Sequence, residues 1–95
     1  GCMNLYLNER KNDIFCVIGR NVKFYRSAYN LTHPHENITQ AKLAEMVGIT
    51  TTQIANLENE TGKGVSVPVL YNIAKVLEVS MDKLCSTEKA LVKID

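Results

Sequence analysis

The sequence has no tryptophan, only two prolines and no long apolar run. No stretch approaches the ~20 apolar residues that a membrane-spanning helix needs, and the first residues lack the basic-then-apolar order of a secretory signal. An excess of charge of one sign is also absent, because 11 basic and 10 acidic residues leave a net charge of +1. These absences favour a small cytoplasmic protein that does not bind membranes.

Reactive clusters are scarce as well. The three cysteines, Cys2, Cys16 and Cys85, are widely spaced and form no C-x-x-C pair, so we expect neither a disulfide framework nor a zinc site. Cys16 and Cys85 are predicted to be small core residues. His33 and His35 share one loop, which favours a solvated loop over a metal site. No glycine-rich phosphate loop is present. We therefore expect no metal, no cofactor and no enzymatic activity.

The chain has the length and apolar content of one globular domain, with 95 residues of which 45% are apolar. Apolar residues recur on one helical face from Ile14 to Tyr29, and the turn-forming stretch 30–37 then predicts a loop. Good N-cap side chains precede the later apolar-periodic segments: Thr39, Thr50, Ser66 and Ser80. They predict helices over 40–47, from 51 to about 59, from the Ser66 cap to Leu77, and over 81–84. The predicted fold class is all-α with five helices.

The two ends of the chain carry weaker patterns. Residues 1–13 have no helical period and are predicted to be an N-terminal arm, either disordered or part of an interface. Residues 86–95 are predicted to be a C-terminal tail with a possible role in dimerisation. The domain itself is expected to span residues 14–85.

Residues 40–57 hold small and apolar side chains at fixed offsets. Two short helices can cross closely only if a small side chain, here Ala44, lies at the crossing and the turn residue, here Gly48, permits positive φ. The side chains expected to be buried are Leu43, Val47, Ile49, Ile54 and Leu57. The opposite face of the second helix is uncharged and can hydrogen-bond base edges: Thr51, Thr52, Gln53 and Asn56.

The stretch from Ile18 to Cys85 resembles the Cro and repressor helix-turn-helix family, also called XRE-like, through ITQAKLAEMVGITTTQIANLEN and LYNIAKVLEVSMDKL. The resemblance implies a lambda-repressor-like fold with the helix-turn-helix as helices two and three. It places Thr51, Thr52 and Asn56, with Gln53 as their neighbour, near DNA bases. It places Gln40, Asn59 and Lys63 near the DNA backbone. It also implies a structural salt bridge between Arg26 and Glu58.

Three features depart from the family pattern, and one of them is the loop before Thr39, which is longer than usual and holds His33 and His35. Glu60 and Glu78 stand where a helix-ending glycine is common, so the sequence does not predict the exact residues at which these two helices end. Phe24 falls on the outer side of the first helix, next to Tyr25 on the inner side, which predicts that the arm or a partner covers Phe24.

The sequence supports two hypotheses for the function. The resemblance implies a transcriptional regulator, expected to be a repressor, that binds a palindromic operator in double-stranded DNA as a homodimer through helix three in the major groove. The near-neutral charge favours an alternative, because phosphate binding usually leaves a basic face. That alternative is a protein-interaction module, such as an antitoxin or antirepressor partner, with weak or lost DNA binding.

Overall fold

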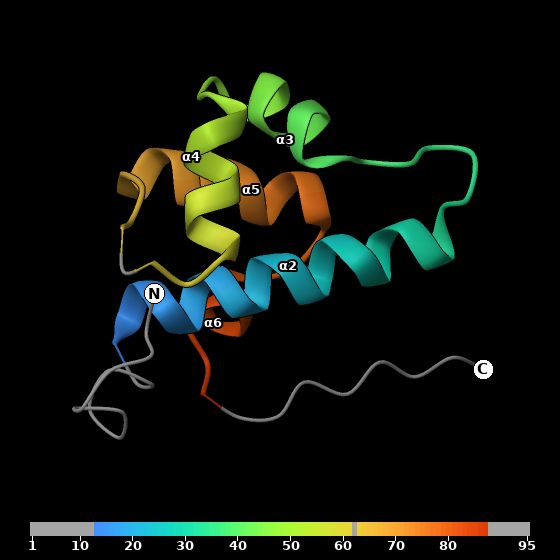
Figure 1. Cartoon of the computed structure of the whole chain (residues 1–95). Coiled ribbons are helices and arrows are strands. Elements are labelled where there is room, and N and C mark those ends of the chain that lie inside the picture. The colour runs from blue at the N-terminus through green and yellow to red at the C-terminus, as the bar shows by residue number, and fades with distance from the viewer. Residues whose placement is uncertain (1–12, 62, 88–95) are drawn as a thin grey trace.

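The computed structural model describes residues 13–61 and 63–87 of the chain (Figure 1). These residues form the helices α2 (Ile14–Thr32), α3 (Gln40–Val47), α4 (Thr51–Glu58), α5 (Val67–Leu77) and α6 (Met81–Leu84). The described part of the chain contains no strand, so the predicted all-α class with five helices is confirmed. None of these helices combines the length and apolar character needed to cross a membrane. The predicted arm, apart from Asp13, and the predicted tail beyond Thr87 lie outside the described residues.

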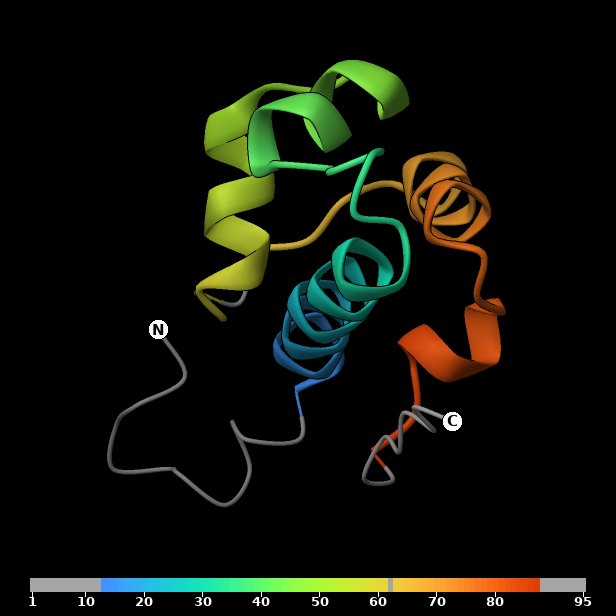
Figure 2. The same cartoon turned by 90° about the vertical axis from the view of Figure 1, so that its right-hand side faces the viewer.

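The long helix α2 forms the centre of the fold. Figure 2 views it almost along its axis, with α3 and α4 toward one side and α5 and α6 toward the other. Helix α2 contacts α4, α5 and α6, and α3 packs on α4 and α5. Helix α4 lies at an edge of the molecule (Figure 1). It packs against α2, which lies below it in this view, and against α3, which lies above it.

Four of the helices begin where the capping pattern predicts. In each case the cap hydroxyl accepts a hydrogen bond from the backbone amide three residues later, which satisfies one of the amides that a helix start leaves unpaired. The four caps are Thr39, Thr50, Ser66 and Ser80. Helix α2 has a cap that the sequence analysis did not identify, because Asp13 accepts from the amides of Phe15 and Cys16 at 3.0 and 3.4 Å.

The helix ends required one correction. The predicted loop over residues 30–37 is too long, since α2 continues through Thr32 and ends with His33 as its C-cap. Pro34 disfavours helical backbone only at the residue before it, so residues 30–32 remain free to continue the helix. Gly48 ends α3 with a φ of 81°, as predicted, whereas Glu60 and Glu78 adopt φ of 57° and 59° without being glycine.

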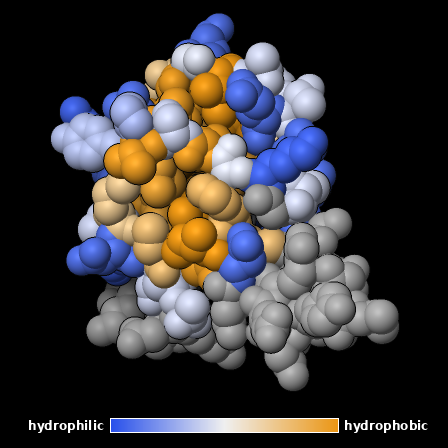
Figure 3. Space-filling model, turned by 90° about the vertical axis from the view of Figure 1, so that its left-hand side faces the viewer, coloured by the Kyte–Doolittle hydropathy of each residue, from blue (hydrophilic) through white to orange (hydrophobic). Residues whose placement is uncertain are grey.

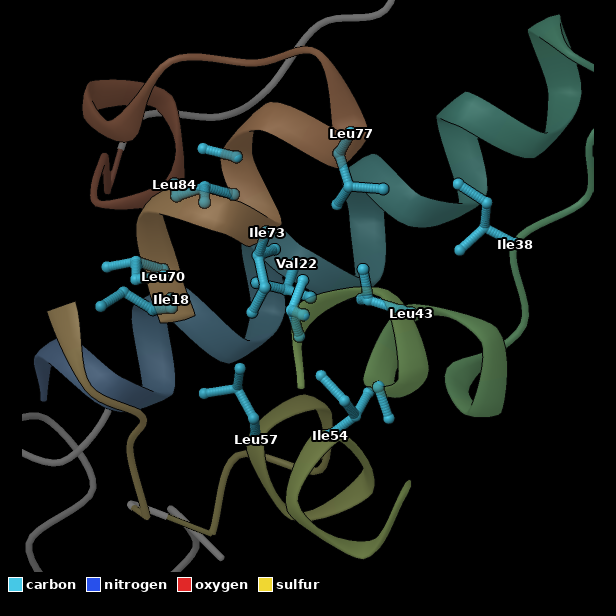
Figure 4. Packing of buried hydrophobic residues seen from close by; sticks show 13 residues of the cluster. Ile18, Val22, Ile38, Leu43, Ile54, Leu57, Leu70, Ile73, Leu77 and Leu84 are labelled. Atoms are coloured by element: carbon cyan, nitrogen blue, oxygen red, sulfur yellow. The ribbon is translucent and has the colours of Figure 1, made fainter. Parts of the chain in front are cut away.

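The core is one cluster to which every described helix contributes (Figure 4). The buried residues predicted within 40–57 all face this cluster, with Ile49 only partly buried at its margin. The inner face of α5 is buried as predicted: Leu70, Ile73, Ala74 and Leu77. Ile38, which was not assigned to the core, is also buried in it, at 5% exposure.

Some predicted core positions differ. Ile14 is 47% exposed, because side chains on a helix lean toward its N-terminus and Ile14 is the first residue of α2. Cys85 is a half-buried free thiol. Cys16 is fully buried, as predicted, and it is also disulfide-bonded, which the spacing of the cysteines did not indicate. Phe24 was predicted on the outer side of α2, and it is exposed there and packs edge-on against Tyr25. The arm that was expected to cover it lies, apart from Asp13, outside the described residues.

Apolar side chains gather on one face of the molecule (Figure 3). This face lies over the ends of α2 and α5 that point to the left in Figure 1. The first residue of each of these helices, Ile14 and Val67, is exposed, at 47% and 71%. Contiguous exposed apolar surface on a small domain is typical of contact with another macromolecule.

Helices α2 and α4 approach each other unusually closely at Gly19. A Cβ atom built on Gly19 would lie only 1.8 Å from the backbone oxygen of Leu57. Glycine within a helix normally costs about 0.5–1 kcal/mol relative to alanine. Here glycine is required because no other residue leaves room for the end of α4.

We expect Gly19→Ala to destabilise the protein by about 3 kcal/mol, because the added methyl group meets a backbone atom that cannot move aside without separating the two helices. Urea denaturation followed by circular dichroism measures the loss. The matched control is Ser27→Ala on the exposed side of the same helix, which should change stability by no more than about 0.5 kcal/mol. Equal midpoints for Gly19→Ala and wild type would contradict the close approach.

Candidate nucleic-acid interface

The first turns of α4 carry the side chains predicted to meet DNA bases. Thr51, Thr52 and Gln53 are exposed and Asn56 is half-buried, while Ile54 on the opposite face is completely buried. Among the described residues, no hydrogen-bond partner engages the hydroxyls of Thr51 and Thr52 or the side-chain amide of Asn56. These polar groups are therefore available to a ligand.

The side chain of Gln53 is committed to its own helix. Its Oε1 atom accepts hydrogen bonds from the backbone amide of Thr50 at 2.9 Å and from the Thr50 hydroxyl at 3.2 Å. The Thr50 hydroxyl in turn lies 3.1 Å from the backbone nitrogen of Gln53, so the two residues form a capping box. Only the Nε2 group of Gln53 remains for other contacts, because its oxygen is engaged by Thr50. Gln53 therefore cannot bind a base in the two-bond mode, which uses both the oxygen and the nitrogen of the amide.

The other end of α4 is fixed by a buried ion pair. The Glu58 side chain is 1% exposed and accepts two hydrogen bonds from Arg26, from Nε at 2.8 Å and from Nη2 at 2.9 Å. Such two-pronged pairs are among the strongest in proteins because the planar guanidinium matches the carboxylate. The hydrogen bonds to Glu58 raise the pKa of Arg26 against the opposing effect of partial burial, and the negative charge of Glu58 raises it further.

The same pair reaches two other segments. Arg26 also donates from Nη1 to the backbone oxygen of Ile38 at 3.1 Å. Asn30 clamps Ile38 from both sides, accepting from its amide at 2.7 Å and donating to its oxygen at 2.9 Å. Gln40 donates from Nε2 to Glu58 at 2.9 Å. Helix α2 thereby fixes both the start of α3 and the end of α4.

The residues expected to contact the DNA backbone lie at a helix start, at a helix end and in a connecting segment. Gln40 is the first residue of α3, and the hydrogen bond to Glu58 leaves its backbone amide and the second hydrogen of Nε2 for an anion. Asn59 is the exposed C-cap of α4, and Lys63 is exposed in the connection to α5. Free amides and a positive dipole end make a helix start attractive to phosphate.

His33 is the C-cap of α2, and His35 is exposed in the loop that follows. The ring of His33 stacks on Tyr29 with centroids 3.9 Å apart, and its Nδ1 lies 3.0 Å from the Tyr29 oxygen. Residues 13–61 and 63–87 contain no group of three His, Cys, Asp or Glu side chains arranged to hold a metal ion.

Sequence reasoning did not identify several residues that position this surface. Gly19 admits the end of α4 against α2, and Asn30 holds the loop before α3 through Ile38. Asn21 is buried and donates to the backbone oxygens of Lys83, Leu84 and Ser86, which ties α6 to α2. A buried asparagine on an otherwise apolar helix face was the available signal, because buried polar groups need partners.

We expect Arg26→Ala to destabilise the protein by about 3–5 kcal/mol, because it leaves the Glu58 carboxylate buried without its cation. Arg26→Lys should also destabilise it, since lysine keeps the charge but lacks the fork that spans both carboxylate oxygens. The control is Lys42→Ala, which removes an exposed pair with Glu45 at 3.3 Å and should cost less than about 1 kcal/mol. Thermal and urea denaturation compare the variants, and equal losses for Arg26→Ala and Lys42→Ala would contradict this role of Glu58.

Comparison with known proteins agrees with this geometry. No curated protein and no solved structure matches the chain. A family model described as helix-turn-helix matches residues 35–84, which are 50 of the 95 residues. The match takes in α3, α4, α5 and α6. Members of this family are DNA-binding domains and not enzymes. The chain therefore belongs to the helix-turn-helix family of the XRE and Cro-repressor type.

Proposed function

We propose that this DNA-binding protein is a transcriptional repressor that reads a palindromic operator as a homodimer, with α4 in the major groove. The observation that carries the proposal is the free, uncharged polar surface at the start of α4, formed by Thr51, Thr52 and Asn56. Hydrogen-bonding side chains on an exposed helix face are what base edges in the major groove require. Such a protein would act in the cytoplasm.

The remaining predicted contacts divide into two kinds under this proposal. Gln40, Asn59 and Lys63 would touch phosphates and set the register of the protein on the duplex, which carries no sequence information by itself. Gln53 would mainly preserve the start of α4 and could add one hydrogen bond through Nε2. Arg26 and Glu58 would not touch DNA, since both hold α4 in place from within.

The homodimer follows from how operators are read. Two recognition helices about 34–36 Å apart meet successive turns of the major groove on one side of the duplex. A second copy of the chain doubles the number of base contacts that one short, weakly charged α4 can make. It also doubles the phosphate contacts that a chain of net charge +1 provides.

Selection of bound duplexes from random DNA tests the proposal. We expect enriched sites with two inverted half-sites whose centres lie about 10 base pairs apart. An enriched single half-site, bound by one chain, would contradict the homodimer. No enriched sequence at all would contradict specific DNA reading and would favour a protein-interaction module instead.

Substitution separates base reading from backbone docking. We expect Asn56→Ala to weaken the selected site by about 1–3 kcal/mol and to relax its sequence preference. Lys63→Ala should weaken all duplexes almost equally and reduce the salt slope of binding by about one. Fluorescence anisotropy over a salt series on selected and scrambled duplexes measures both effects. If Asn56→Ala binds both duplexes as wild type does, α4 is not the reading helix.

A further inference from the structure

The reading surface of α4 has an unusual chemistry for its proposed task. Residues 50–61, which include the whole helix and its caps, contain no lysine and no arginine. Arginine or lysine bound to the O6 and N7 atoms of guanine is the commonest specific contact in the major groove. Helix α4 therefore lacks the side chains that most often select G·C pairs.

What the surface does carry is methyl groups and one free amide. Thr51 and Thr52 are exposed, and each presents a methyl group beside its hydroxyl. Ala55 and Asn56 are half-buried and lie one turn further along, four residues after Thr51 and Thr52 respectively. Residues four apart are neighbours on a helix, so two short rows form: Thr51 with Ala55, and Thr52 with Asn56.

Each of these groups matches an A·T pair. Alanine and threonine methyl groups contact the C5-methyl group of thymine, which no other base presents in the major groove. The asparagine amide pairs with the N6 and N7 atoms of adenine. Gln53, the other side chain able to pair with adenine in this way, has its oxygen engaged by Thr50.

We infer that α4 selects A·T pairs at the centre of each half-site, with Thr51, Thr52 and Ala55 packed on thymine methyl groups and Asn56 bound to adenine. The inference rests on the proposed function, because it names the bases that the proposed surface reads. G·C pairs are disfavoured because they offer no methyl group to the threonines, and no cation on α4 approaches guanine.

The first experiment uses the full chain and the sites selected from random DNA. We expect the central positions of each half-site to be A·T. Replacing a contacted thymine by deoxyuridine removes only the C5-methyl group and should weaken binding about fourfold. Replacing the contacted adenine by 7-deazaadenine removes the N7 acceptor and should weaken binding about tenfold. Inosine·cytosine pairs keep the minor groove of A·T but alter the major groove, so they should also bind weakly.

Paired substitutions at Thr52 identify the group that reads the base. Thr52→Val keeps a methyl group and loses the hydroxyl, so its binding should still weaken when thymine becomes deoxyuridine. Thr52→Ser keeps the hydroxyl and loses the methyl group, so it should bind both duplexes alike. Asn56→Ala should likewise be indifferent to 7-deazaadenine. Thr52 is exposed, and an unchanged unfolding midpoint verifies that each variant is folded.

The outcomes separate this inference from the proposed function. Enriched half-sites with a G·C centre, or equal binding of thymine and deoxyuridine duplexes by wild type, would overturn A·T selection while specific DNA binding stands. Full binding of the inosine·cytosine duplexes would also overturn it, because the minor groove would then carry the preference. The absence of any enriched site would overturn the proposed function and A·T selection together.

Discussion

The buried carboxylate of Glu58 is the constraint on which the rest of the structure depends. A carboxylate without partners would be costly to bury, and here Arg26 and Gln40 supply three hydrogen bonds to it. These two partners come from α2 and α3, so the last residue of α4 has a fixed position relative to both helices. Arg26 also binds the oxygen of Ile38, which extends the same constraint to the loop before α3. One ion pair thereby sets the relative placement of the two short helices that the family uses to bind DNA.

The two ends of α4 are held by separate means, and the separation leaves its outer face free. Thr50 and Gln53 satisfy each other at the start of the helix, and Glu58 is held at its end. Ile54 and Leu57 are buried between them. An isolated helix of eight residues is not stable in water, so these tertiary and capping contacts supply the order that α4 needs. None of them uses the hydroxyls of Thr51 and Thr52 or the side-chain amide of Asn56, so the residues that stabilise α4 differ from those proposed to read DNA.

Most features determined by nearby residues could be predicted from the sequence, although the Asp13 cap of α2 was missed. Features determined by distant residues could not be predicted from the local pattern. The caps Thr39, Thr50, Ser66 and Ser80 act within one helical turn, and the positive φ of Gly48 is a property of its own backbone. Gly19 and Asn21 have roles only because α4 and α6 come to lie against α2, 38 or more residues later in the chain. The pairing of Arg26 with Glu58 is also long-range, and it was expected only through the family resemblance. Which side-chain atoms of Gln53 and Gln40 are engaged in hydrogen bonds depends on side-chain geometry, and this cannot be predicted from the periodicity of apolar residues.

Several cations of the described residues are engaged in ion pairs with acidic side chains. Arg26 forms an ion pair with Glu58. Arg20 and Lys42 form ion pairs with Glu60 and Glu45, at 3.0 and 3.3 Å. Each of these pairs reduces the positive potential that attracts a duplex, so we expect counterion release to supply a smaller share of the affinity than in a strongly basic protein. In the proposed complex the balance must come from helix starts, whose amides bind phosphate without net charge, and from close packing on base edges. Packing on base edges depends on sequence and counterion release does not, so a weakly charged reading helix gains specificity relative to its non-specific affinity.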